Sequence, residues 1–234
     1  MSIGAGETTL MRLVAAYATV VNGGKQITPT LIDRIQDRNG MTTFRHDERP
    51  CANCTVEAWA DQPPPTLPDP RARLIQPGTA YQMVSMLQGV VDRGTGRRIG
   101  QLKLPLAGKT GTTNESLDTW FIGFSPDLAV GVFVGFDTPR TLGKRETGSS
   151  VPAPIFKDFM ARALEGKPVI PFRVPPDIRL VRVNPETGLV ALPGERATIL
   201  EAFKPGTAPR EFGSIIGEDL GRGVNTGGPR RGIY

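Results

Sequence analysis

The amino-acid sequence predicts an α/β fold, because three segments with helical periodicity surround three consecutive strand-like segments, two of them joined by a tight turn. The length of 234 residues indicates one large domain or two small ones. Glycine (28) and proline (22) are frequent, yet together they stay below the share of about 25–30% that is typical of low-complexity chains. We therefore expect a folded chain that is rich in turns.

Three segments place apolar side chains three and four residues apart, which is the spacing of one helix face. The first spans residues 7–22 and stops at two glycines. The second follows Pro77-Gly78 and stops at Gly94-Thr95-Gly96, and the third spans residues 152–164. Glycine just after the last apolar position commonly ends a helix, so these boundaries favour three helices.

Strand-like segments lie between the second and third predicted helices. Residues 102–113, 119–124 and 128–136 are the candidates, and Ser125-Pro126-Asp127 has the composition of a hairpin turn. The last of these segments is apolar at almost every position, which predicts a central strand buried on both faces.

The rest of the chain reads as shorter elements and loops. We expect a weak strand within residues 27–37 and a small hairpin over residues 178–192. Residues 45–70 hold both cysteines and a run of prolines, and they predict a long extended loop. The expected parts are a main domain over 1–168, a β-hairpin extension over 169–204 and a disordered tail over 205–234.

The net charge of +5 is mild, and the basic residues are scattered rather than clustered. Nucleic-acid binding is therefore not expected, because a basic patch with interleaved aromatic residues is missing. An anionic substrate or surface fits the charge equally well. No apolar run reaches the roughly 18 residues that a membrane-spanning helix needs, and the first residues lack the pattern of a signal peptide.

Cys51 and Cys54 form one Cys-x-x-Cys pair, with the single histidine, His46, five residues upstream. One pair supplies only half of the ligands of a structural zinc site, so no metal is expected. A thioredoxin-type redox pair needs a strand–helix–strand context that the charged, proline-rich surroundings do not give. The favoured interpretation is a small loop closed by a disulfide if the protein is exported.

The most informative segment is residues 107–113, Ala-Gly-Lys-Thr-Gly-Thr-Thr. A phosphate-binding loop would need glycine at position 103, where the chain has Lys103, and a helix directly after Thr110. The alternative is a Lys-Thr-Gly motif on a strand that borders a nucleophilic cleft. The second interpretation fits better, because a polar turn and a β-rich segment follow.

The residue types of this motif suit the binding of a carboxylate. Strand alternation places Thr110 and Thr112 on one face, so two hydroxyl groups can donate to one anion. Lys109 adds positive potential, and Gly111 leaves room for a substrate backbone along the strand. The backbone N–H of Thr112 is a candidate donor to an oxyanion.

Many further segments, in order over about residues 3–205, resemble the transpeptidase domain of class A penicillin-binding proteins, the bifunctional murein synthases of the 1A type. The matching segments are Gly4–Leu10, Ala16–Ala18, Val21–Gly24, Ala80–Met83, Leu87–Val91, Gly94–Gly96, Ala107–Asn114, Asp118–Asp127, Val134–Asp137, Glu146–Gly148 and Ala153–Phe156.

The resemblance implies a β-lactamase-like antiparallel sheet flanked by helices, and a serine acyltransferase that cross-links peptidoglycan. In the family, a serine attacks the penultimate D-alanine carbonyl of a stem peptide, and β-lactams acylate the same serine. Carried over, Lys109 is the catalytic lysine of the Lys-Thr-Gly motif, and substrate is bound by Thr110, Gly111, Thr112 and Thr113. No cofactor and no metal are implied.

The family's Ser-x-x-Lys and Ser-x-Asn motifs have no counterpart among the seven serines of this chain. In the family both motifs, the glycosyltransferase domain and the membrane anchor precede the segment that matches residue 7. The expectation is therefore a C-terminal fragment that lacks the nucleophile, is inactive alone, and belongs to an enzyme at the periplasmic face of the inner membrane. Its expected partners are stem peptides, β-lactams and the N-terminal half of the enzyme. The alternative is a non-catalytic module that binds stem peptides or partner proteins.

Overall fold

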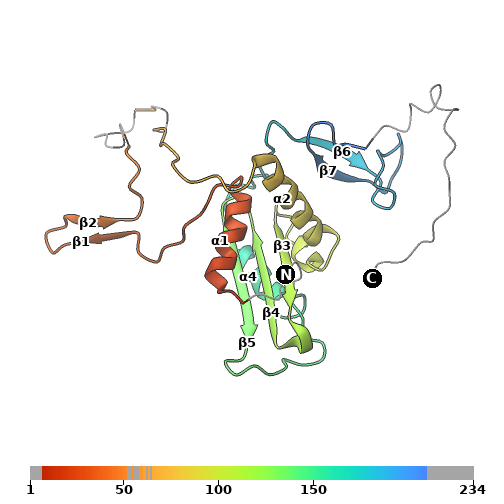
Figure 1. The fold of residues 1–234 in the computed structure, drawn as a ribbon, viewed down its shortest axis with the longest axis horizontal. Coiled ribbons are helices and arrows are strands. Elements are labelled where there is room, and N and C mark those ends of the chain that lie inside the picture. Colours follow the sequence, from red (N-terminus) through yellow and green to blue (C-terminus); the bar gives the residue numbers. More distant parts are fainter. Residues whose placement is uncertain are drawn as a thin grey trace. The chain divides into compact units, whose positions relative to one another are not determined.

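The computed structural model describes residues 7–209 except 52, 53, 55–57, 59, 62 and 64. The chain forms two compact units that divide after Ile178 (Figure 1). The prediction of a tail over 205–234 falls almost wholly on residues 210–234, which lie outside the described residues.

The first unit is built on three antiparallel strands in the order β3-β4-β5. These are β3 (Ala107–Thr112), β4 (Asp118–Phe124) and β5 (Ala129–Gly135). The predicted antiparallel sheet is confirmed, but the prediction that residues 128–136 form the central strand is wrong for the described strands. Strand β4 is central, and β5 is only half-buried.

Strand β3 begins five residues later than its apolar pattern predicts. Lys103 adopts a φ of 53°, in the left-handed region, and Pro105 has no backbone N–H to add to a ladder. The pairing with β4 therefore starts at Ala107, which lies opposite Phe124, and runs to Thr112 opposite Thr119.

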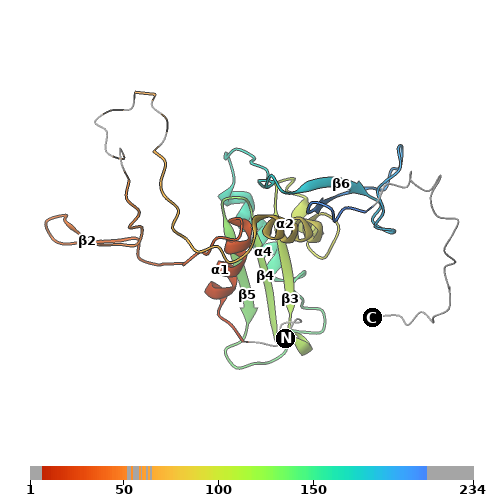
Figure 2. The ribbon, with the colours of Figure 1, turned by 45° about the horizontal axis from the view of Figure 1, so that its top comes forward.

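Helices cover both faces of this sheet (Figures 1 and 2). Helices α1 (Leu10–Val21) and α2 (Pro77–Asp92) lie on one face, where Tyr17 packs edge-on against Phe124 at 6.4 Å between ring centroids. On the other face lie the single turn α3 (Arg97–Gly100) and helix α4 (Pro152–Ala163). There Phe156 packs against Phe121 in a tilted arrangement, with 4.7 Å between the ring centroids. The three helices predicted from periodicity are all present, whereas α3 is too short to leave a periodic signal.

A long excursion leaves the sheet between α1 and α2. It carries a hairpin of β1 (Arg34–Gln36) and β2 (Thr42–Arg45), of which only β1 falls in a predicted strand. The excursion is closed at its base, where Lys25 pairs with Arg73 in an isolated bridge and the Lys25 ammonium lies 2.7 Å from Asp69. Hydrogen bonds from Arg71 and Lys25 hold the pKa of the Asp69 carboxyl well below its usual range.

The second unit contains β6 (Arg179–Val183) paired with β7 (Ile199–Phe203). The predicted hairpin over 178–192 is only partly present, because residues 184–192 contribute just a bridge between Val183 and Val190. The turn forms as expected, with Asn184 Oδ1 accepting the Glu186 and Thr187 amides. The returning segment ends at Pro193, which lacks an amide donor. Strand β7 pairs along the other edge of β6, since Val183 has Val190 on one side and Ile199 on the other.

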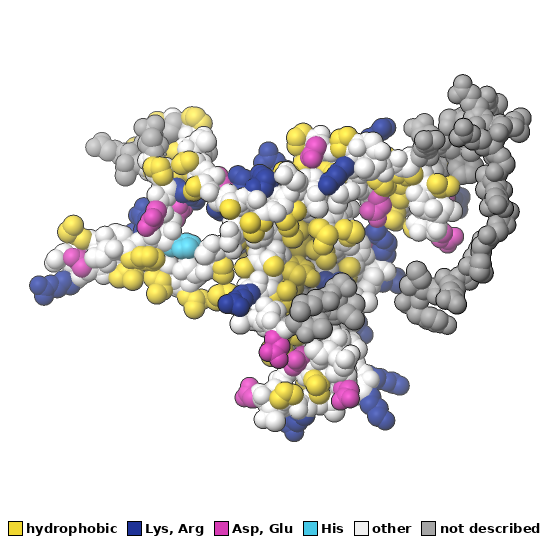
Figure 3. Space-filling view, in the orientation of Figure 1, with side chains coloured by type: hydrophobic (Ala, Val, Ile, Leu, Met, Phe, Trp, Pro, Cys, Tyr) yellow, Lys and Arg dark blue, Asp and Glu magenta, His cyan; other side chains and the backbone are white. Residues whose placement is uncertain are grey.

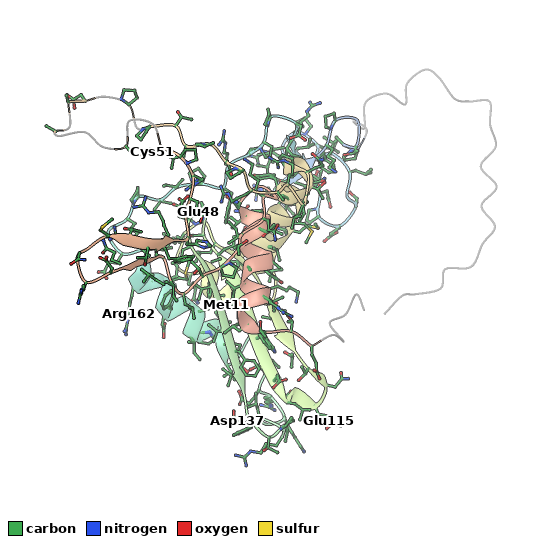
Figure 4. The ribbon with its side chains drawn as sticks, turned by 60° about the vertical axis from the view of Figure 1, so that its left-hand side comes forward. Met11, Glu48, Cys51, Glu115, Asp137 and Arg162 are labelled. Carbon is green, nitrogen blue, oxygen red and sulfur yellow. A yellow bond between two sulfur atoms is a disulfide. The ribbon has the colours of Figure 1, made fainter. Side chains whose placement is uncertain are left out.

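Several large apolar side chains of the first unit are exposed on its helices. Met11 on α1 and Met86 on α2 are 45% and 54% exposed, and Ile155 and Phe159 on α4 are about as open. Figure 3 shows hydrophobic side chains gathered over α1 and α2, and Figure 4 labels Met11 there. Among the described residues, no strand pairs with the outer edge of β5.

An unpaired strand edge next to an apolar surface favours association. We expect the isolated chain to elute from a size-exclusion column above the position of a 25.2-kDa monomer, and to unfold over a broad temperature range. A monodisperse monomer with one sharp thermal transition would contradict this expectation.

Candidate functional site

The candidate site is the free edge of the three-stranded sheet, formed by β3. The Thr113 amide donates to the Asp118 carbonyl at 3.1 Å. In an antiparallel pair the backbone N–H and C=O groups of every second residue point to the partner strand, so this bond shows which residues of β3 point toward β4. Lys109 and Gly111 therefore direct their backbone groups toward β4, whereas Gly108, Thr110 and Thr112 direct theirs toward the open edge. The Thr112 amide thus lies where a strand-like ligand can accept from it.

The side chains of the motif divide between the two faces of the sheet. Lys109 and Gly111 lie on the face of α1 and α2, opposite Ile122 and Trp120, and Thr110 and Thr112 lie on the face of α4. The Lys109 side chain curls around the open edge of β3 toward the face of the two threonines. Its ammonium group donates to the Thr110 carbonyl at 2.9 Å and lies 3.4 Å from Thr110 Oγ1.

Thr113 lies beyond the strand, in the turn that joins β3 to β4. Its hydroxyl accepts the Asp118 amide at 2.8 Å, so this side chain fastens the turn. Glu115 and Ser116, in the same turn, have φ values of 59° and 51°, which are unusual for residues with side chains. Glu115 and Asp137 mark one end of the sheet in Figure 4.

Two residues that the sequence did not single out as site residues contact the hydroxyls of Thr110 and Thr112, and a third residue holds one of the two in place. Thr95 Oγ1 lies 3.0 Å from Thr110 Oγ1, and the Gly148 amide donates to Thr112 Oγ1 at 3.0 Å. Ser149 Oγ donates to the Thr95 carbonyl at 2.7 Å and joins the two contacts. These contacts join residues that lie 15 or more positions apart in the chain, so a local sequence pattern cannot reveal them. The only hint in the sequence is the pair of glycines on either side of Thr95.

The geometry suits a carboxylate rather than a phosphate. A phosphate-binding loop needs a helix N-terminus after Thr110, yet residues 107–112 are an extended strand that continues into a turn. The edge instead combines one ammonium group, two hydroxyl groups and an outward backbone amide within residues 109–112. Such a set can bind a terminal carboxylate and donate to a neighbouring carbonyl oxygen.

The cysteine loop is separate from this edge. Cys51 and Cys54 are joined by a disulfide with 5.5 Å between their α-carbons, and Cys51 is labelled in Figure 4. No group of three or more metal-ligating side chains occurs among residues 7–209 where the structure describes them. In the same described part, no helix is long and apolar enough to cross a membrane.

Comparisons with known proteins agree on one family. Residues 1–161 match the model of the penicillin binding protein transpeptidase domain. Penicillin-binding protein 1A of Rickettsia conorii is 46% identical over 206 residues, which cover 87% of this chain and 26% of that protein. Penicillin-binding protein 1A of Pseudomonas aeruginosa is 37% identical over 239 residues, which cover 89% of this chain and 29% of that protein.

A solved structure agrees in fold. The crystal structure of penicillin-binding protein 1A from Haemophilus influenzae matches with a TM-score of 0.68 and 30% identity, over 89% of this chain and 34% of that one. The chain therefore spans roughly a quarter to a third of the length of the proteins it matches.

Proposed function

Because the chain belongs to the family of penicillin-binding protein transpeptidase domains, we propose that β3 is the substrate-binding edge of a peptidoglycan D,D-transpeptidase. In this proposal the terminal carboxylate of a stem peptide binds to Lys109, Thr110 and Thr112. The peptide backbone lies along Gly111, and the Thr112 amide donates to the carbonyl oxygen that becomes an oxyanion during acylation.

The observation that carries the proposal is the open ladder of β3. Thr112 offers its amide at an edge that no other described strand covers, and both threonine hydroxyls lie beside it. A peptide can add to such an edge as an extra strand, so that backbone hydrogen bonds supply affinity and the carboxylate group supplies specificity. A non-catalytic module that only binds stem peptides would use the same edge.

Calorimetric titration of the chain with an N-acylated D-Ala-D-Ala peptide tests the binding role. We expect binding of the peptide acid, weaker binding of its C-terminal amide, and about tenfold or greater loss for Lys109→Met, because a charge-assisted hydrogen bond disappears.

Lys144→Met removes the same charge from an exposed position in the loop after β5 and is the matched control. Equal binding of the acid and the amide, or equal loss in both lysine variants, would refute a carboxylate-specific edge.

An acylation assay can distinguish a transpeptidase from a non-catalytic binding module only if the protein that is tested contains the nucleophile. Since no Ser-x-x-Lys motif occurs in these 234 residues, we propose that the acylating serine lies outside them and that the chain alone is inactive. We expect no mass increase after incubation with a fluorescent penicillin, measured on the intact chain. A stable one-to-one covalent adduct would show that the nucleophile is within the chain.

The parent enzyme is proposed to act at the periplasmic side of the inner membrane, where peptidoglycan is assembled and where the disulfide between Cys51 and Cys54 is stable.

A further inference from the structure

The Gly94-Thr95-Gly96 segment contacts the site through Thr95, but the proposed function gives it no part in ligand binding. The chain folds back at the end of α2, where the amides of Gly94 and Gly96 both donate to the Val90 carbonyl, at 3.1 and 2.9 Å. A β-carbon at Gly94 would lie 2.9 Å from the Val90 α-carbon, so this tight return requires glycine there. The return places the exposed Thr95 side chain against β3.

Two hydroxyl groups on β3 each have a protein neighbour that directs them. Thr112 Oγ1 accepts from the Gly148 amide at 3.0 Å, which leaves the proton of the Thr112 hydroxyl free to donate outward. Thr110 Oγ1 lies 3.0 Å from Thr95 Oγ1 and 3.4 Å from the Lys109 ammonium. If the Thr95 hydroxyl donates, the Thr110 oxygen accepts from both neighbours, and its own proton points away from them.

The position of Thr95 is itself held from a second segment. The Ser149 hydroxyl donates to the Thr95 carbonyl at 2.7 Å, and Ser149 follows the glycine that contacts Thr112. The turn at residues 147–150 thus connects both threonine hydroxyls of β3 through three hydrogen bonds.

We propose that Thr95 is a positioning residue, which donates to Thr110 Oγ1 and so directs the Thr110 proton toward the bound carboxylate. This inference rests on the proposed function and deepens it, because it adds a residue that prepares the binding edge without touching the ligand. A hydroxyl that accepts one hydrogen bond is polarised toward donating another, so the chain from Thr95 through Thr110 to the carboxylate is cooperative.

The test compares Thr95→Val, which replaces the hydroxyl by a methyl group of similar size, with Thr95→Ser, which keeps the hydroxyl. The readout is the ratio of affinities for the N-acylated D-Ala-D-Ala acid and its C-terminal amide, measured by calorimetry on the whole chain. We expect Thr95→Val to lower this ratio about fivefold, the order of effect of one hydrogen bond, and Thr95→Ser to restore it to within about twofold. The matched control is Thr43→Val, the same substitution in strand β2.

A role confined to stability would lower the melting temperature of Thr95→Val and leave the affinity ratio unchanged, and this result would overturn the inference. If Thr95→Val does not fold, Ser149→Ala provides the test. It removes the hydrogen bond to the Thr95 carbonyl and leaves the Thr95 side chain unchanged, and we expect it to lower the affinity ratio about twofold. An unchanged ratio in Ser149→Ala would likewise overturn the inference. If the wild-type chain itself does not prefer the acid, the proposed function fails first, and the inference fails with it.

Discussion

Replacing Gly148 by alanine is expected to lower the melting temperature by about 6–12 °C, corresponding to a loss of about 3 kcal/mol. The new β-carbon would lie 2.6 Å from the Trp120 carbonyl oxygen and 2.7 Å from the Gly111 carbonyl oxygen. Both atoms belong to paired strands, so they cannot retreat without disturbing the ladder between β3 and β4.

The same substitution should weaken binding of the peptide acid, because the Gly148 amide would move away from Thr112 Oγ1. Thermal unfolding followed by circular dichroism gives the stability change. Gly89→Ala is the matched control, since the three atoms nearest to its β-carbon belong to the guanidinium group of Arg93, the far end of a long side chain, and not to the backbone. Alanine also suits the interior of α2, so Gly89→Ala should keep or raise the melting temperature. Equal losses in the two variants would argue against a specific close approach at Gly148.

Phe121→Ala is expected to lower the free energy of unfolding by about 3–5 kcal/mol, the cost of a large cavity in a packed core. Phe121 is fully buried and packs against the tilted ring of Phe156, with 4.7 Å between the ring centroids. Gly108 and Gly123 flank its ring so closely that a β-carbon at either position would lie 2.8 Å from it. The ring therefore fixes the spacing between β3 and β4, and with it the geometry of the binding edge.

Urea denaturation measures this loss. Phe133→Ala is the control, because Phe133 is 43% exposed, and its ring centroid lies 4.5 Å from that of Trp120. We expect the control to lose about 1 kcal/mol. A loss of that size for Phe121→Ala as well would mean that the core under β3 is loosely packed.

The helices and the core strands follow from local signals in the sequence. Periodicity locates α1, α2 and α4, and the tight turn at residues 125–127 locates the hairpin of β4 and β5, because these elements depend on neighbouring residues. The pairing of strands is harder to predict from the sequence, since it depends on contacts between segments that are distant in the chain. The predicted hairpin over residues 178–192 leaves out β7 for this reason, and the predicted central strand of the three is wrong for the same reason.

The same distinction explains what could be predicted of the site. The Lys-Thr-Gly motif is contiguous, so the sequence identifies Lys109, Thr110 and Thr112 as candidates. The contacts of Thr95 and Gly148 arise only when α2 and the turn before α4 meet the strand. These contacts are common hydrogen bonds of a hydroxyl group and a backbone amide. The residue type of Thr95 therefore does not distinguish it from the other threonines of the chain.

The central claim is that the edge of β3 binds a terminal carboxylate, and mapping the bound ligand tests it most directly. In amide NMR spectra of the labelled chain, the N-acylated D-Ala-D-Ala acid should shift the resonances of Thr110, Gly111 and Thr112 most strongly. At the same concentration, the C-terminal amide of the peptide should shift them less, and ATP should leave them nearly unchanged. Shifts centred on another part of the chain, or a response of Gly108 and Lys109 to ATP in place of the peptide, would contradict the account.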